Sequence, residues 1–171
     1  MTSFRPYRLA DGTQVLLRPI RPDDKLGLDA AFARLSPESR RLRFLGPKPR
    51  LTTAELRYLT AVDGRDHVAL VAVPTHAPAF IMGVGRYVRD AERPDTAEVA
   101  VVVGDPIQGQ GLGRHIGLAL ADVARENGIR RFTATMLSDN RASHALFARI
   151  SERLHFEHHN GVEELVAELA A

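Results

Sequence analysis

The glycines of one short stretch are spaced where a protein could bind an anion. The stretch Gln108-Gly-Gln-Gly-Leu-Gly-Arg114 follows an apolar run that ends at Val103 and opens a segment of helical periodicity. Because glycine has no Cβ, successive backbone N–H groups can turn inward and a phosphate can approach them closely. A helix beginning there would add its unpaired N–H groups and the positive end of its dipole. The pattern predicts a diphosphate-binding turn.

The spacing excludes two other glycine motifs. No glycine stands three residues after Gly111 or Gly113, so the dinucleotide-binding pattern G-x-G-x-x-G is absent, and the P-loop sequence Gly-Lys-Ser/Thr does not occur. A glycine-rich turn without a ligand stays open as the simpler interpretation.

Glu98 lies near the start of the expected strand that leads into this turn. It is the only charged residue in the segment 97–103, and it alternates with Ala100 and Val102 on one face of the expected strand. A carboxylate in such a position can take a proton from an attacking nucleophile. The alternative is a solvated carboxylate at the start of the strand.

The rest of the chain alternates between strand and helix periodicity around this stretch. We expect an α/β (α+β) fold in which a mixed central sheet of about six to seven strands carries helices on both faces, as a single domain over residues 1–171. Pro19 places the first strand at a sheet edge. The expected strands are 13–20, 67–73, 80–88, 97–103, 131–137, 155–158 and 162–169, and the expected helices are 22–35, 37–45, 52–62, 111–127 and 140–154.

Composition narrows the class of protein. The chain is 44% apolar and 26% charged, which is ordinary for a globular domain, and it has no cysteine for disulfides, thiolate metal ligands or a thiol nucleophile. No apolar run is long enough to cross a bilayer and the N-terminus does not resemble a secretion signal, so we expect a cytoplasmic protein without a membrane partner.

The basic balance does not predict nucleic-acid binding. The net charge is only +2, and only two of the 23 basic residues are lysine, so the pI of about 9.4 reflects arginine content. No basic strand carries interleaved aromatic residues. A nucleic-acid partner is therefore not expected.

One cluster of histidines and one of arginines could in principle bind a metal ion or an anionic acceptor. His155, His158 and His159 lie close together in the last hairpin, but their spacing fits no metal pair, so no metal site is expected. The arginines of segment 40–43 either face solvent or face an anionic acceptor, and a solvated helix face is the more common case.

Taken together, these motifs resemble the GCN5-related N-acetyltransferase (GNAT) superfamily over about residues 13–169. The resemblance rests on Gln108-x-x-Gly111-x-Gly113 after an apolar strand, on the order of elements that follow, and on Asn140-x-x-Ser143-x-x-Leu146-Phe147 opening the next helix. The segments 17–24 and 35–44 also resemble the catalytic domain of bacterial protein lysine acetyltransferases.

The resemblance implies acetyl-CoA as acetyl donor and assigns roles to residues. The strand at Val101–Val103 would pair with the pantetheine arm, residues 108–114 would hold the diphosphate, and Asn140 would contact pantetheine. Glu98 would be the general base, as a glutamate on this strand is in related lysine acetyltransferases. The implied donor-binding residues are Val101, Val102, Val103, Gln108, Gly109, Gln110, Gly111, Leu112, Gly113, Arg114, Asn140, Ser143 and Phe147.

One family feature is missing. Many members have a tyrosine general acid where this chain has Phe147. A thiol with a pKa near ~8.5 is a tolerable leaving group, and backbone N–H groups near Val102 or Val103 could polarise the carbonyl instead. Tyr87 on the neighbouring strand is a remote substitute for the acid, and packing is its more common role.

We therefore expect an acetyl-CoA-dependent N-acetyltransferase in which a primary amine attacks directly in a ternary complex. The favoured acceptor is a protein lysine, whose deprotonation at pH 7 costs roughly 4.6 kcal/mol. A small-molecule amine and a CoA-binding module without turnover remain alternatives. The protein is expected to be a monomer or homodimer.

Overall fold

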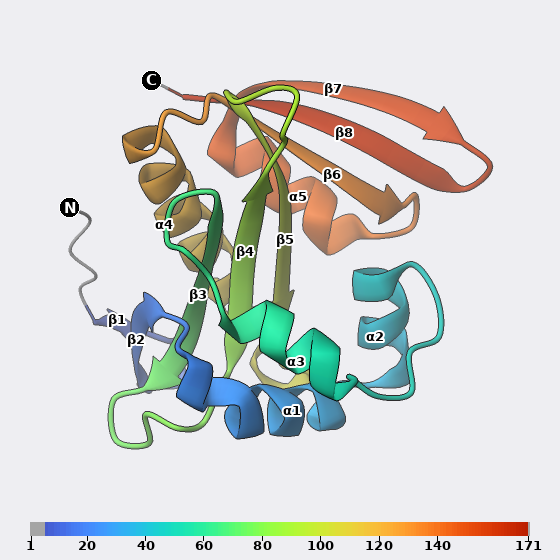
Figure 1. Cartoon of the computed structure of the whole chain (residues 1–171). Coiled ribbons are helices and arrows are strands. Elements are labelled where there is room, and N and C mark those ends of the chain that lie inside the picture. Colours follow the sequence, from blue (N-terminus) through green and yellow to red (C-terminus); the bar gives the residue numbers. More distant parts are fainter. Residues whose placement is uncertain (1–5, 171) are drawn as a thin grey trace.

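The computed structural model describes residues 6–170, which form one mixed sheet with helices on both faces (Figure 1). Among these residues no helix combines the length and apolarity that crossing a membrane requires. The strands are β1 (Tyr7–Arg8), β2 (Gln14–Pro19), β3 (His67–Pro74), β4 (Gly83–Arg89), β5 (Thr96–Val103), β6 (Arg131–Leu137), β7 (Ser151–His159) and β8 (Val162–Leu169). The helices are α1 (Lys25–Arg34), α2 (Pro37–Phe44), α3 (Thr53–Thr60), α4 (Leu112–Glu126) and α5 (Arg141–Ile150), with 3₁₀ turns η1 (Pro22–Asp24) and η2 (Asp105–Ile107).

The strand order is β1-β2-β3-β4-β5-β6-β8-β7. All neighbouring pairs are antiparallel except β5 and β6, which are parallel. Strands β3, β4 and β5 are neighbours at the centre of the sheet. A parallel pair needs a crossover connection, and α4 supplies it.

The helices divide between the two faces of the sheet and produce two buried clusters. Helices α4 and α5 cover one face, where β5 contributes Val99 and neighbouring odd-numbered residues. Helices α1 and α3 cover the other face, where Val102 contributes from β5. The two-residue period of the strand therefore sends its even- and odd-numbered side chains into different environments.

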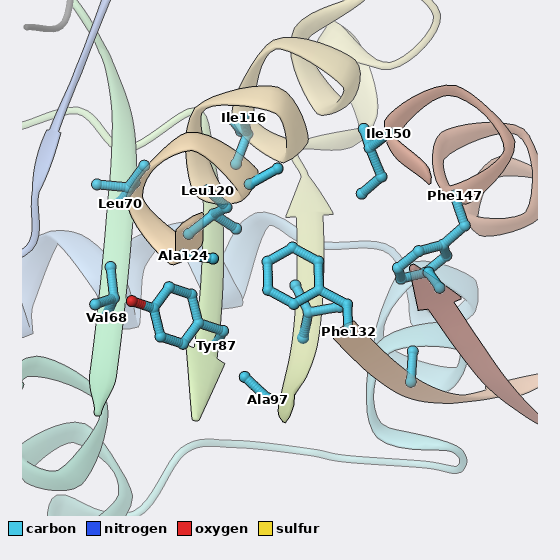
Figure 2. Close-up of a cluster of buried hydrophobic side chains, with 14 of the residues drawn as sticks. Val68, Leu70, Tyr87, Ala97, Ile116, Leu120, Ala124, Phe132, Phe147 and Ile150 are labelled. Atoms are coloured by element: carbon cyan, nitrogen blue, oxygen red, sulfur yellow. The ribbon is translucent and has the colours of Figure 1, made fainter. Parts of the chain in front are cut away.

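Helix α4 packs very closely on the centre of the sheet. Ile116 and Leu120 lie over β4, and a Cβ added at Gly85 would sit 2.3 Å from Ile116 Cγ2 and 2.6 Å from Leu120 Cδ1. Figure 2 shows these side chains with Tyr87 and Phe132 in the same cluster. Only a glycine at position 85 allows this approach.

The largest differences between the expected elements and the structure lie at the edge of the sheet and after the fifth helix. The sheet has eight strands, because the short β1 pairs with β2 and replaces it at the edge. The fifth helix ends at Ile150, and β7 begins at Ser151. Leu154, expected on the helix, lies on β7 opposite Ala167, because pairing with β8 outweighs the local helical periodicity.

Candidate functional site

The site begins where β5 and β6 separate (Figure 1). Their parallel pairing covers only Thr96–Glu98 on β5 and residues 131–133 on β6. Beyond this point β6 continues beside β8, whereas β5 continues beside β4. Within residues 6–170 no strand pairs with this side of β5 after Glu98. The separation leaves a cleft bordered by backbone groups.

Backbone hydrogen bonds determine which β5 residues face the cleft. At the two ends of the β4–β5 ladder, Gly104 N–H donates to Met82 O and Asp90 N–H donates to Thr96 O, each at 2.9 Å. Even-numbered residues of β5 therefore bond to β4, because antiparallel ladders alternate. Val101 consequently points its N–H and C=O into the cleft, where an extended ligand could pair with them.

The alternation of hydrogen bonds along β5 shows which N–H groups could contact the thioester carbonyl. Val102 is even-numbered, so its N–H is directed at β4, and the N–H groups of Val101 and Val103 are the ones that face the cleft. The carbonyl of Val103 already accepts a hydrogen bond from Gln108 Nε2 at 3.0 Å.

The glycine stretch forms the expected turn at the end of the cleft. Gly109 and Gly111 have φ of +79° and +84°, in the left-handed region that favours glycine. Gly111 is the N-cap of α4 and offers no side-chain acceptor to the first helical N–H groups. A Cβ at Gly113 would meet only Val103 Cγ2, at 3.6 Å. The turn therefore directs free N–H groups and a helix dipole outward, as a phosphate site requires.

The opposite wall of the cleft comes from the beginning of α5. Asn140 is the N-cap of that helix, and its Oδ1 accepts from Ser143 N at 3.1 Å. The Asn140 side chain is buried, with 8% of the residue exposed, so capping holds the amide in one orientation at the cleft wall. Phe147, one helical turn beyond Ser143, is buried in the core cluster and also borders the cleft.

The cleft has a volume of about 550 Å³ and gathers most of the predicted donor-binding residues. Gln110 is the exception: it does not border the cleft, and its Oε1 is buried without a hydrogen bond. The predicted residues that do line the cleft are Val101, Val102, Val103, Gln108, Gly109, Gly111, Leu112, Gly113, Arg114, Asn140, Ser143 and Phe147.

Helix α2 joins the two sides of the cleft, which the sequence did not predict. Asp105 accepts from the backbone N–H of Ser36 at 3.0 Å and from the hydroxyls of Ser36 and Ser39 at 2.6 and 2.8 Å. On the other side, Arg41 Nη2 donates to Asp139 Oδ2 at 2.7 Å. Ser36 is the N-cap of the helix expected at 37–45, but no local sequence feature linked it to Asp105.

Glu98 lies at the point where β5 and β6 part, and its side chain is exposed. It shares its face of β5 with Ala100 and Val102, as expected, which is the face toward α1 and α3. Arg43 on α2 is near enough that the charge of Glu98 acts on it. Glu98 itself does not border the cleft, but the next two residues of β5, Val99 and Ala100, do.

The arginines of α2 lie in different environments, and Arg41 remains at the surface, where it pairs with Glu38 and Asp139. Arg40 lies over the Phe32 ring, 4.5 Å from its centroid, and donates to Ala33 O and Pro49 O. Arg43 points inward and borders the cleft. The expected solvated face therefore holds for Arg41 but not for Arg43, since α2 also contacts β5 and β6.

A second, mainly apolar cavity adjoins the cleft beneath α1 and α3. We call it the front chamber; its volume is about 340 Å³, and Arg43, Ala100, Val102 and Ile107 border both it and the cleft. Arg86 of β4 also lines the front chamber and is 7% exposed. Burial and the charge of Arg43 lower the pKa of Arg86 to about 10, so the Arg86 guanidinium remains charged at neutral pH. Burial also lowers the pKa of Arg43.

The other residues considered for chemistry lie elsewhere. Tyr87 is fully buried, donates to Arg65 O at 3.2 Å and accepts from Asn127 Nδ2 at 2.8 Å, which supports packing as its role. His155, His158 and His159 are exposed on the edge strand β7. Residues 6–170 contain no group of three or more His, Asp or Glu side chains arranged for a metal ion.

The cleft fits the arm and diphosphate of a CoA thioester. An extended amide-containing chain could pair with the free backbone of Val101, while the Gly109–Gly113 turn supplies N–H donors for phosphates.

Comparison with known proteins agrees with this geometry. Residues 14–157 match the acetyltransferase (GNAT) domain family. The acetyltransferase PA5475 of Pseudomonas aeruginosa is 36% identical over 136 residues, covering 78% of this chain and 72% of that protein. The acetyltransferase Pat of Mycolicibacterium smegmatis is 33% identical over 145 residues, covering 85% of this chain but only 43% of that longer protein.

A solved structure shows the same architecture. The GNAT domain of S. lividans PAT superposes with a TM-score of 0.85 and 32% identity, covering 97% of each chain. One explanation accounts for the separation of β5 and β6, for the glycine turn and for the match over residues 14–157. This chain belongs to the GNAT acetyltransferase family and uses acetyl-CoA.

Proposed function

We propose that this acetyltransferase transfers an acetyl group to a primary amine with Glu98 as general base, and that a protein lysine is its favoured acceptor. The observation that carries the base assignment is the position of Glu98 at the residue where β5 parts from β6. The two residues that follow Glu98, Val99 and Ala100, border the cleft, so the carboxylate lies next to the proposed transfer site.

The protein's own groups then have separate tasks. Glu98 takes the proton of the attacking ammonium group, directly or through water, which offsets part of the roughly 4.6 kcal/mol that deprotonation costs at pH 7. The N–H groups of Val101 and Val103 donate to the carbonyl oxygen as its negative charge grows. Bound acetyl-CoA supplies the thioester, whose carbonyl carbon the amine attacks and whose sulfur leaves as thiolate.

The protein-lysine acceptor is supported by the similarity to Pat and to the S. lividans PAT domain. A small-molecule amine is the second candidate, and the mainly apolar front chamber favours it, because a cavity of this kind could hold the body of a small acceptor. We keep monomer or homodimer as the expected assembly.

Thiol release from acetyl-CoA, measured across lysine peptides, folded proteins and small amines, tests the proposal. We expect release with at least one acceptor class. Tight acetyl-CoA binding without release for any acceptor would instead indicate a CoA-binding module.

A further inference from the structure

The front chamber combines apolar walls with three cationic side chains, Arg34, Arg43 and Arg86. Leu28, Phe32 and Phe44 belong to its walls, and Arg43 and Arg86 are the cations that reach it from α2 and β4. Burying a charged group in such surroundings is costly unless an opposite charge or hydrogen bonds compensate for it. The positive charges in the chamber therefore call for an anionic partner.

The direct contacts of Arg43 and Arg86 are all with neutral groups. Arg86 Nη1 donates to Leu59 O at 3.1 Å and lies 3.2 Å from His67 Nε2. Arg43 makes a cation–π contact, 4.9 Å from the Phe44 centroid, and no hydrogen bond to any residue in the described range. Neither arginine forms an ion pair with a carboxylate among residues 6–170.

The remaining charges around the chamber do not neutralise the pair. Asp105 lines the chamber, but its carboxylate already accepts three hydrogen bonds from Ser36 and Ser39. Arg34 adds a further cation and donates to Ile81 O. Glu98 acts on Arg43 only through its field, without direct contact.

The position of the arginines connects the chamber to the transfer site. Arg86 lies opposite Ala100 in the β4–β5 register, and Ala100 borders both the chamber and the cleft. Glu98 is two residues before Ala100 on the same face, about 7 Å away along the strand. A small substrate could therefore reach from the reacting position to both guanidiniums.

We propose that the front chamber is a carboxylate-binding subsite, in which Arg43 and Arg86 hold the carboxylate of a substrate with an apolar body. This inference rests on the proposed transfer reaction. The carboxylate has two possible sources: the acceptor, as in an apolar amino acid, or the far end of a dicarboxylic acyl chain on CoA. Guanidinium forks suit either source equally.

Matched substrate pairs distinguish the two sources. In the acceptor arm, leucine is compared with isoamylamine, the same molecule without its carboxylate, using acetyl-CoA as donor. In the donor arm, succinyl-CoA is compared with butyryl-CoA, using isoamylamine as acceptor. We expect kcat/KM for the carboxylate member of one pair to exceed that of its partner by roughly 10- to 100-fold.

The variant that tests the assignment is Arg43→Gln, because Arg43 makes no hydrogen bond that its loss would break. In Arg43→Gln the kcat/KM ratio of the carboxylate substrate to its partner should fall close to one. Arg43→Lys should keep part of the preference for the carboxylate substrate. Arg57→Gln removes the same charge from an exposed position on α3 and should leave the ratio unchanged. If the wild type transfers the acyl group but shows kcat/KM ratios near one for both pairs, the carboxylate subsite would be overturned. The proposed acetyltransferase activity would still stand.

A binding measurement keeps the subsite testable if no transfer occurs. Titration calorimetry compares isocaproate with its neutral amide, isocaproamide, on the wild type and on Arg43→Gln. Binding of isocaproate alone, lost in Arg43→Gln, would support the subsite even if the proposed reaction failed. Equal binding of both compounds, or of neither, would overturn it.

Discussion

Ser39 Oγ donates to Asp105 Oδ1 at 2.8 Å and so ties α2 to the loop that leads into the glycine turn. With the two bonds from Ser36, this carboxylate holds the N-terminal end of α2 beside β5. Burial raises the pKa of Asp105, but the hydrogen bonds from Ser36 and Ser39 outweigh it and leave the pKa below its ordinary value.

Asp105→Asn should lower the free energy of unfolding by about 1–2 kcal/mol, because an amide offers one acceptor oxygen where the carboxylate offers two. Urea unfolding at pH 7 measures this, with the exposed Asp29→Asn as control. Since the folded-state pKa is depressed, this contribution is present above about pH 4 and is lost as the pH falls through the folded value. A variant as stable as the wild type at pH 7 would contradict the tie.

Gly113→Asp should abolish acetyl-CoA binding while the domain stays folded. The new Cβ would have only ordinary contact with Val103, but the carboxylate would stand among the N–H groups expected to hold the diphosphate. Calorimetry with acetyl-CoA measures the loss. Gly46→Asp, where a Cβ meets nothing within 4 Å, controls for the added charge. Retained affinity would remove the diphosphate assignment from this turn.

Glu98→Gln should lower kcat by roughly 100-fold or more with little change in acetyl-CoA affinity, because the base acts on the acceptor and not on the donor. Its residual activity should rise with pH toward the amine pKa near ~10.4, since the free amine then forms without the base. Steady-state thiol release over a range of pH shows both effects. The exposed Glu92→Gln removes an equal charge from the β4–β5 turn and should behave as the wild type. Unchanged turnover in Glu98→Gln would exclude the base role.

His67 should make the protein less stable below neutral pH. Burial and the neighbouring Arg86 lower the pKa of His67, so the folded state favours its neutral form. The unfolded chain then binds more protons, and stability is full above about pH 6.5 and declines as the pH falls through the folded value. Chemical unfolding at pH 7.5 and 5 should show a smaller decline for His67→Gln than for the wild type. The exposed His76→Gln should keep the wild-type decline, and equal declines in all three proteins would refute the assignment.

The local signals in the sequence were sufficient to determine the strand, turn and helix of residues 96–126. Glycine at positions 109 and 111 adopts positive φ, alternation places Glu98 and Val102 on one face, and the period of α4 marks Ile116 and Leu120 as buried. These properties depend on the conformational preferences and spacing of residues close together in the chain.

Only the tertiary structure decided how this unit becomes a site. The separation of β6 from β5 depends on β8, which pairs with β6 in antiparallel orientation. The inward position of Arg43, its nearness to Arg86 and the contact of Ser39 with Asp105 depend on α2 crossing the cleft. A long polar side chain on an amphipathic helix has the same local sequence signal whether it faces water or a cavity, because its environment is set by segments distant in the chain.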